Sequence, residues 1–296
     1  MVLVLIPMAD VTNLSAYKFT PLDELPAWRE RLLRSARARG LKGTILLSHE
    51  GINLFVAGTS EHVNAFVAEL RALRGLEDLV PKLSPGTAQP FGRLLVKIKP
   101  EIIAFGVEGI DPARRPARAL APETLRQWLD EGRPVTLLDT RNDYEVKLGT
   151  FRGAVPAGIR RFRDFPAAVD RLPVEWKSPD RPIVAFCTGG IRCEKAAPYL
   201  ERAGFGDVWQ LEGGILKYFE RCGGAHFDGE CFVFDQRVGV DQRLQETGAV
   251  LCACCQQPVT ALEQSDPRYV AGRSCPGCFA RVGDLVTPTP ATTEAS

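Results

Sequence analysis

The sequence predicts an α+β domain followed by an α/β domain and then a small cysteine-rich module. Three observations support this fold class. Strand-like and helix-like segments follow the order β-α-β-β-α-β over the first third of the chain. Nearly continuous apolar strands, typical of a parallel sheet covered on both faces, occupy the middle. Five of the nine cysteines in this 296-residue chain lie within residues 252–278.

Residues 1–110 are expected to form the α+β domain, with a ferredoxin-like, split-βαβ arrangement. The first helical region carries leucines and a tryptophan on one side and arginines on the other, which is the pattern of an amphipathic helix. Thr59 or Ser60 is expected to cap the second helix. The expected elements, in chain order, are a strand at 15–19, a helical region at 21–39, strands at 44–47 and 52–56, a helix ending near Leu73, and a strand at 94–98.

Residues 111–120 are rich in proline and arginine without periodicity, and they are predicted to be a linker. The α/β domain is expected at 121–225, the cysteine-rich module at 226–282 and a disordered tail at 283–296. The expected elements of the α/β domain are a helix at 122–131, a strand at 135–139, a strand ending at Phe186, a helix at 193–202, a strand at 208–211 and a helix that opens at Gly213 and Gly214.

The loop that follows the strand ending at Phe186 is the strongest functional signal. A strand, a glycine loop and a helix N-terminus together form an anion-binding geometry, where a cysteine has a pKa below its usual value of about 8.5. A buried structural cysteine is the alternative, but consecutive glycines let the backbone wrap an anion, which a packing cysteine does not need. The candidate groups are Cys187 and Arg192 as catalytic residues and the backbone N–H groups of Thr188, Gly189, Gly190 and Ile191.

Cys193 stands one residue beyond this loop and is a candidate second thiol. It could resolve a sulfenic acid or a persulfide on Cys187, or it could be a helix residue that faces the core, and the sequence favours neither. Asp139, Arg141 and Glu145 follow the first strand of the domain. Either Arg141 or Asp139 shapes the charge around Cys187, or a structural ion pair braces the strand end, and the second interpretation is favoured.

Four cysteines near the C-terminus have the spacing of a zinc ribbon, with two C-x₂-C pairs. They are Cys252, Cys255, Cys275 and Cys278. The segment is too small to make a core of its own, and structural zinc supplies folding free energy to small modules. Thiols without metal, disulfides and an iron–sulfur cluster are the alternatives to this zinc site.

Composition limits the partners of the chain. The net charge of +1 excludes attraction of the whole molecule to a polyanion, so a nucleic-acid surface must come from local patches. No run of apolar residues reaches the length of a membrane span, and we expect no membrane partner and a cytoplasmic location. The sequence has no Rossmann or Walker motif, so no nucleotide cofactor is expected.

Two clusters of arginines could bind phosphates or could be solvated surface. They are Arg29, Arg31, Arg34, Arg37 and Arg39, and Arg160, Arg161 and Arg163.

The α/β domain resembles a rhodanese domain. The segments that carry this resemblance are Asp139-Thr140-Arg141, the segment 149–154, the loop 187–192 and Leu211-Glu212-Gly213-Gly214. In that family a loop of this length handles sulfur, whereas the related phosphatase loops are one residue longer. The resemblance therefore implies sulfur chemistry at Cys187 and disfavours a phosphatase.

Over about residues 14–280 the chain is similar to the TrhO family of bacterial tRNA uridine hydroxylases. The shared segments are 187–196, Glu50-Gly51-Ile52-Asn53, 229–235 and the paired cysteines near the end. The resemblance implies hydroxylation of uridine 34, the wobble position, to 5-hydroxyuridine. It implies molecular oxygen as co-substrate and the anticodon region of tRNA as partner. The alternative function is a thiosulfate-type sulfurtransferase that forms a persulfide on Cys187.

Overall fold

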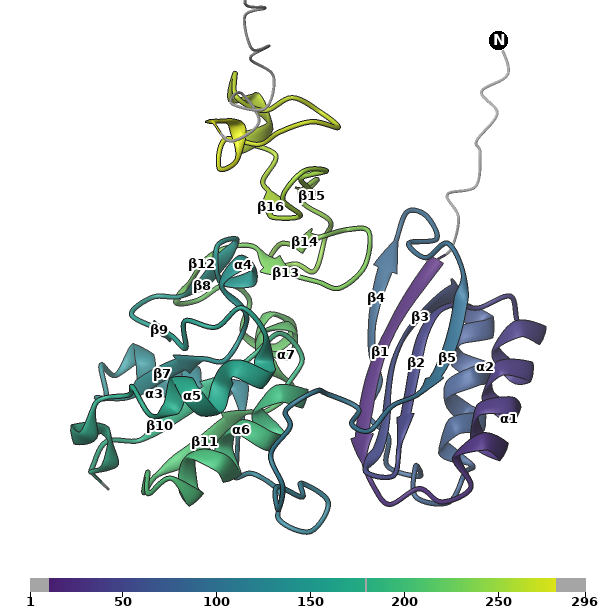
Figure 1. The fold of residues 1–296 in the computed structure, drawn as a ribbon, viewed down its shortest axis with the longest axis horizontal. Helices are drawn as coiled ribbons and strands as arrows, with labels where there is room; N and C mark the ends of the chain where they lie inside the picture. The colour runs from purple at the N-terminus through teal and green to yellow at the C-terminus, as the bar shows by residue number, and fades with distance from the viewer. Residues whose placement is uncertain (1–10, 179, 281–296) are drawn as a thin grey trace, which may run out of the picture.

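A five-stranded sheet with two helices on one face forms the N-terminal domain of the computed structural model, which describes residues 11–178 and 180–280 (Figure 1). The tail expected at 283–296 lies outside the described residues. The elements of this domain are β1 (Val11–Phe19), α1 (Leu25–Ala38), β2 (Lys42–Ser48), β3 (Gly51–Thr59), α2 (Ser60–Arg71), β4 (Lys82–Gly86) and β5 (Leu94–Ile98).

The strand order β4-β1-β3-β2-β5 contains the predicted β-α-β-β-α-β arrangement, with one correction. The sequence assigned its fourth strand to residues 94–98. That segment is instead the fifth strand, paired parallel with β2, and β4 lies antiparallel beside β1 at the other edge. Strand propensity does not predict β4, because its segment Ser84-Pro85-Gly86 contains proline and glycine, which are poor strand formers. Pro85 is tolerated there because β4 is an edge strand.

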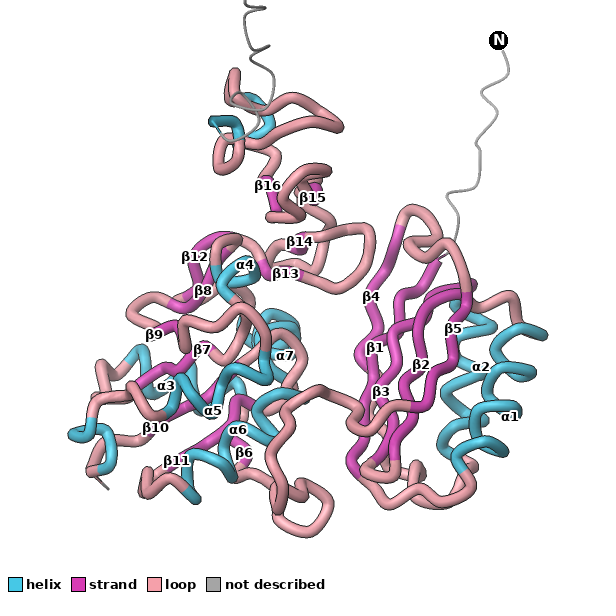
Figure 2. Tube along the Cα trace, in the orientation of Figure 1, coloured by secondary structure: helices cyan, strands magenta, loops and turns pink. Residues whose placement is uncertain are grey.

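Helices α1 and α2 cover one face of this sheet, and the other face is turned toward the second domain (Figure 1 and Figure 2). Leu14 and Ala16 of β1 are buried in the core beneath the helices. Since side chains alternate along a strand, Asn13, Ser15 and Tyr17 point to the opposite, helix-free face.

A parallel five-stranded sheet with the order β6-β11-β10-β7-β9 forms the second domain. The strands β7 and β10 are buried along their whole length, as the apolar pattern predicts. One apolar core lies on each face of this sheet, one containing Phe165 and Leu200 and the other Leu125 and Tyr218. The elements are β6 (Ala119–Leu120), α3 (Pro122–Asp130), β7 (Thr136–Asp139), α4 (Asp143–Val146), β8 (Gly149–Phe151), β9 (Val155–Pro156), α5 (Phe165–Val169), β10 (Ile183–Phe186), α6 (Ile191–Arg202), β11 (Val208–Leu211) and α7 (Gly214–Cys222).

The rest of the chain consists of short antiparallel pairs. The first of them, β12 (Phe227–Gly229), pairs with β8 of the second domain. Then β13 (Cys231–Phe232) pairs with β14 (Gly239–Val240), and β15 (Val250–Leu251) pairs with β16 (Pro258–Val259). Within residues 11–178 and 180–280, no helix is long and apolar enough to cross a membrane.

A buried ion cluster joins the two domains. The Lys195 side chain of α6 is 2% exposed, and its ammonium lies 2.8 Å from Glu50 and 2.7 Å from Glu101. A buried ammonium is strongly destabilised when it loses its carboxylate partners. Beside this cluster, the Tyr17 hydroxyl of β1 donates to the Glu194 carboxylate at 3.1 Å. These contacts hold the helix-free face of the first sheet against the start of α6.

Candidate active site

Two glycines, Gly190 and Gly214, let neighbouring groups approach the Cys187 loop closely. Gly190 has a φ of +97°, a conformation that favours glycine, and a Cβ there would lie 2.8 Å from the Tyr17 hydroxyl. A Cβ on Gly214 would lie 2.4 Å from the Cys187 carbonyl oxygen. The N–H of Ile215, at the start of α7, donates to that same carbonyl at 2.9 Å. The Gly213-Gly214 pair therefore lets α7 approach and hold the loop.

Cys187 is buried, yet it lines a cavity. Burial opposes its ionisation, but the hydrogen bond from Cys193, the positive charge of Arg192 and the backbone hydrogen bonds of Arg192 and Gly190 outweigh this and lower the pKa of Cys187 to about 5. The Gly190 N–H lies 3.1 Å from Sγ. At neutral pH the loop therefore holds a thiolate.

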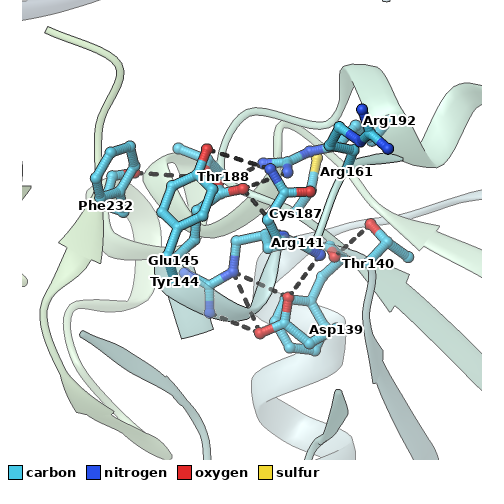
Figure 3. A network of polar contacts seen from close by, with 12 residues as sticks. Asp139, Thr140, Arg141, Tyr144, Glu145, Arg161, Cys187, Thr188, Arg192 and Phe232 are labelled. Carbon is cyan, nitrogen blue, oxygen red and sulfur yellow. Dashed lines mark hydrogen bonds and ion pairs between the residues drawn. The ribbon is translucent and has the colours of Figure 1, made fainter. Parts of the chain in front are cut away.

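Arg192 does not reach toward a ligand as a free cation. Its guanidinium forms a bidentate pair with the buried Glu145 carboxylate of α4, with N···O distances of 2.5 and 2.7 Å (Figure 3). The Thr188 hydroxyl also donates to Glu145, at 3.3 Å. Arg192 thus lowers the pKa of Cys187 through its charge while it anchors the loop to α4.

Asp139 and Arg141 form a fully buried ion pair in the same region (Figure 3). The Arg141 guanidinium also donates to the Gly149 carbonyl at 2.7 Å, and the Thr150 hydroxyl donates to Asp139 at 2.7 Å. The pair therefore braces the end of β7 against the Gly149-Thr150 segment, which agrees with the interpretation that the sequence favours.

Cys193 lies against Cys187 in one buried cluster. Burial raises the pKa of Cys193, and its hydrogen bond to the Cys187 thiolate raises that pKa further. The Thr140 hydroxyl lies 3.5 Å from the Cys193 sulfur. The second thiol is therefore protonated and points at the first, an orientation that the sequence could not supply.

A cavity of about 690 Å³ opens above the loop. Its floor includes Cys187 and Gly189, and one wall is the helix-free face of the first sheet, with Tyr17 and Lys82. Burial lowers the pKa of Lys82 to about 8, although the charge of Cys187 opposes this shift. Phe234, from the chain after β13, closes another side of the cavity.

The two arginine clusters lie in different places. Those on α1 belong to the helix-covered face of the first sheet, away from the cavity, and Arg31 and Arg39 pair there with Glu69. Arg161 and Arg163 of the second cluster line the cavity. Only this second cluster is placed to contact a substrate that enters above Cys187.

Cys252, Cys255, Cys275 and Cys278 converge, with their sulfur atoms all within 4.8 Å of one another. The Cys252–Cys278 and Cys255–Cys275 Sγ distances are 3.7 and 3.6 Å, and Cys275 and Cys278 are 3.7 Å apart. A tetrahedron with Zn–S bonds of about 2.3 Å has Sγ–Sγ edges of about 3.8 Å. The donor set and its size therefore fit a tetrahedral zinc ion.

The sequence placed Glu145 after the first strand of the second domain but did not indicate its pairing with Arg192. Three further residues that sequence reasoning did not place at the site lie in or beside it. They are Tyr17, Lys82 and Lys195. One signal was present for the last of these. The Glu50-Gly51-Ile52-Asn53 segment stands out in the sequence, and its glutamate is a partner of the Lys195 ammonium.

Comparisons with known proteins agree with this architecture. Residues 11–102 match the UPF0176 acylphosphatase like domain, and residues 121–221 match the Rhodanese-like domain. A tRNA uridine(34) hydroxylase of Cupriavidus metallidurans is 48% identical, over 90% of this chain and 96% of that protein. One of Ralstonia nicotianae is 47% identical, also over 90% of this chain and 96% of that protein. The chain therefore belongs to the tRNA uridine(34) hydroxylase family.

Proposed function

We propose that the protein hydroxylates uridine 34 of tRNA to 5-hydroxyuridine, with molecular oxygen as co-substrate. The observation that carries the proposal is the Cys187 thiolate on the floor of a cavity of about 690 Å³. This volume lies in the range of about 300–1,000 Å³ typical of small-molecule sites, so a single nucleobase fits. The names of the relatives support the choice of base.

Cys187 is the proposed reactive group, either as a nucleophile toward the uracil ring or as a carrier of an oxidised sulfur species. The Gly190 N–H and the charge of Arg192 keep its sulfur anionic. Wobble bases lie in a single-stranded loop, so uridine 34 enters such a cavity without the melting of a duplex.

The partner in this proposal is the anticodon region of tRNA, and its location is the cytoplasm. Arg161 and Arg163 at the cavity, together with Lys217, offer cations to the phosphates that flank the base. The arginines of α1 do not line the cavity and are not needed for this contact.

A structural zinc ion held by Cys252, Cys255, Cys275 and Cys278 completes the proposal. When bound, the ion would cross-link the C-terminal cysteine-rich segment, whose own apolar core is small. The four thiolates fill the tetrahedral coordination of the ion, so the proposed site is structural rather than catalytic.

Deletion of the gene tests the proposal. Bulk tRNA from the deletion strain should lack 5-hydroxyuridine-derived nucleosides, and wild-type gene on a plasmid should restore them. Growth under ¹⁸O₂ should label the new hydroxyl group. Unchanged nucleosides in a strain without a paralogue contradict the proposal.

The sulfurtransferase alternative predicts a different result in the same strains. Purified protein would turn over thiosulfate at physiological concentration, and the deletion would leave tRNA nucleosides unchanged. Both functions use the Cys187 loop, so the nucleoside analysis separates them while the thiosulfate assay alone does not.

A further inference from the structure

The helix-free face of the first sheet has an arrangement that the proposed hydroxylation does not yet explain. Register places side chains of β1, β3 and β4 side by side on this face, with Ser15 opposite both Lys82 and Phe55. All of them face the cavity above Cys187. The cavity-lining residues of this face are Asn13, Ser15, Tyr17, Asn53, Phe55, Lys82 and Ser84.

Lys82 offers an unused cation to the cavity. Its ammonium lies 4.9 Å from the centre of the Tyr17 ring, and among the described residues it makes no ion pair and no side-chain hydrogen bond. An ammonium carries three donors and no acceptor. Lys82 is therefore a donor without an assigned acceptor, on the wall that faces Cys187.

Asn13 offers an unused acceptor on the same wall. It is 5% exposed, and its Nδ2 donates to the carbonyls of Ser84 and Pro85 at 3.4 Å. These bonds set the orientation of the amide, because the opposite orientation would place two oxygens together. Its Oδ1 is buried and has no hydrogen-bond partner among the described residues. A buried acceptor without a donor is unfavourable, and a small turn of the Asn13 side chain toward the cavity would bring Oδ1 within reach of a ligand N–H.

Two aromatic rings stand beside this polar pair. The Phe55 and Phe234 ring centres are 6.4 Å apart, and Phe234 is 45% exposed although it lines the cavity. Single-stranded bases stack on aromatic side chains of open sheet faces, while their Watson–Crick edges are read by hydrogen bonds. The wall thus combines a stacking surface with one donor and one acceptor.

We propose that Lys82 and Asn13 read the target base as uracil, a proposal that rests on the proposed hydroxylation of uridine 34. The Lys82 ammonium donates to the 4-carbonyl oxygen, and the Asn13 amide oxygen accepts from N3–H. Lys82 and Asn13 are diagonal neighbours across β1 and β4, and such residues lie about 7–8 Å apart. Both side chains can therefore converge on adjacent atoms at the edge of one base. Cytosine reverses this pattern, with an amino donor at position 4 and an acceptor at N3.

The test measures binding of the full chain to tRNA transcripts with uridine, cytidine or N3-methyluridine at position 34. Wild-type protein should prefer uridine over each of the other two by roughly tenfold, within the range of about 5–150-fold set by one base contact. Lys82→Met should remove most of the preference over cytidine, and Lys82→Arg should keep it. Asn13→Ala should remove the preference over N3-methyluridine, because it removes the amide oxygen that accepts from N3–H.

The matched controls lie away from the cavity. Lys97→Met changes an exposed lysine at the opposite edge of the same sheet, and Asn64→Ala changes an exposed asparagine of α2. Both should leave the three affinities unchanged, and thermal unfolding should show that every variant is folded.

Three results would overturn the reading of uracil. Wild-type protein could bind the three transcripts equally. Lys82→Met could weaken binding to uridine and cytidine transcripts by the same factor, which would make Lys82 a phosphate contact. Asn13→Ala could retain the full penalty for N3-methyluridine. Failure of the hydroxylation itself is distinguishable, because it would appear as unchanged nucleosides in the deletion strain.

Discussion

The same side chain has different surroundings at Cys187 and in the cluster of Cys252, Cys255, Cys275 and Cys278. Cys187 has one thiol neighbour, and the backbone of its loop and the charge of Arg192 stabilise its thiolate. The four sulfurs near the C-terminus instead surround one point, within 4.8 Å of one another. The first arrangement suits a lone reactive thiolate and the second a shared metal ion. The surroundings of a cysteine, rather than its presence, therefore decide its chemistry.

The largest expected effect is the loss of bound metal from the four-cysteine cluster, which distinguishes this cluster from Cys187. Cys275→Ser removes one corner of the tetrahedron, so bound zinc should fall well below one ion per chain and residues 250–280 should become sensitive to limited proteolysis. Structural zinc contributes about 10–16 kcal/mol of apparent binding free energy in small modules. Mass spectrometry of the metal content measures this, with Cys254→Ser as the matched control outside the cluster. A Cys275→Ser protein with full zinc content would contradict the metal assignment.

The next largest effect is a loss of unfolding free energy when the Arg192–Glu145 ion pair, which supports the Cys187 loop, is broken. Glu145→Gln leaves the Arg192 guanidinium buried without its carboxylate, and loss of one partner of a buried pair costs about 3–5 kcal/mol of unfolding free energy. Urea unfolding measures the loss. Glu30→Gln, which breaks the exposed pair with Arg34, should cost at most about 1 kcal/mol. Equal effects of the two substitutions would show that the Arg192 pair does not anchor the loop.

The ionisation of Cys187 predicts a pH dependence with a definite sign. Its pKa of about 5 in the folded protein lies below the value of about 8.5 of a free thiol. A lowered pKa stabilises the folded protein above the unfolded pKa, and this contribution disappears as the pH falls through about 5. The difference in unfolding free energy between wild type and Cys187→Ser should therefore shrink from pH 9 to pH 5. A difference that is constant over this range would mean that Cys187 is protonated at neutral pH.

The smallest expected effect concerns the neighbouring thiol. The hydrogen bond from Cys193 is the largest of the contacts that lower the pKa of Cys187, so Cys193→Ala should raise that pKa. Cys193→Ser keeps a donor and should raise it less. Ultraviolet thiolate absorbance against pH measures both, and the buried Cys231, outside the pair, supplies the control Cys231→Ala. An unchanged pKa in Cys193→Ala would remove Cys193 from the site.

The sequence predicted those parts of both sites that depend on local spacing. A strand, two glycines and a helix determine the Cys187 loop within six residues, and two C-x₂-C pairs indicate the four-cysteine cluster. Contacts between distant residues were not predictable. Tyr17 reaches Glu194 across 177 positions, and Lys195 reaches Glu50 across 145. These contacts depend on how the two domains pack, and no short-range pattern encodes that packing.

The missed edge strand of the first domain, β4, has the same kind of explanation. The segment 82–86 carries proline and glycine, and its position beside β1 is decided by the sheet rather than by propensity. Because Lys82 belongs to this strand, a cation in the cavity was missed with it. The assignment of Arg192 was incomplete for a related reason, since its partner Glu145 lies on another helix.

The central claim is that the Cys187 thiolate acts on uridine 34, and one measurement tests it most directly. The deletion strain is complemented with wild-type, Cys187→Ser or Cys254→Ser protein at equal expression, and 5-hydroxyuridine-derived nucleosides are quantified in bulk tRNA. We predict that wild type and Cys254→Ser restore the modification and that Cys187→Ser leaves it at the level of the deletion strain. Full modification with Cys187→Ser would contradict the account.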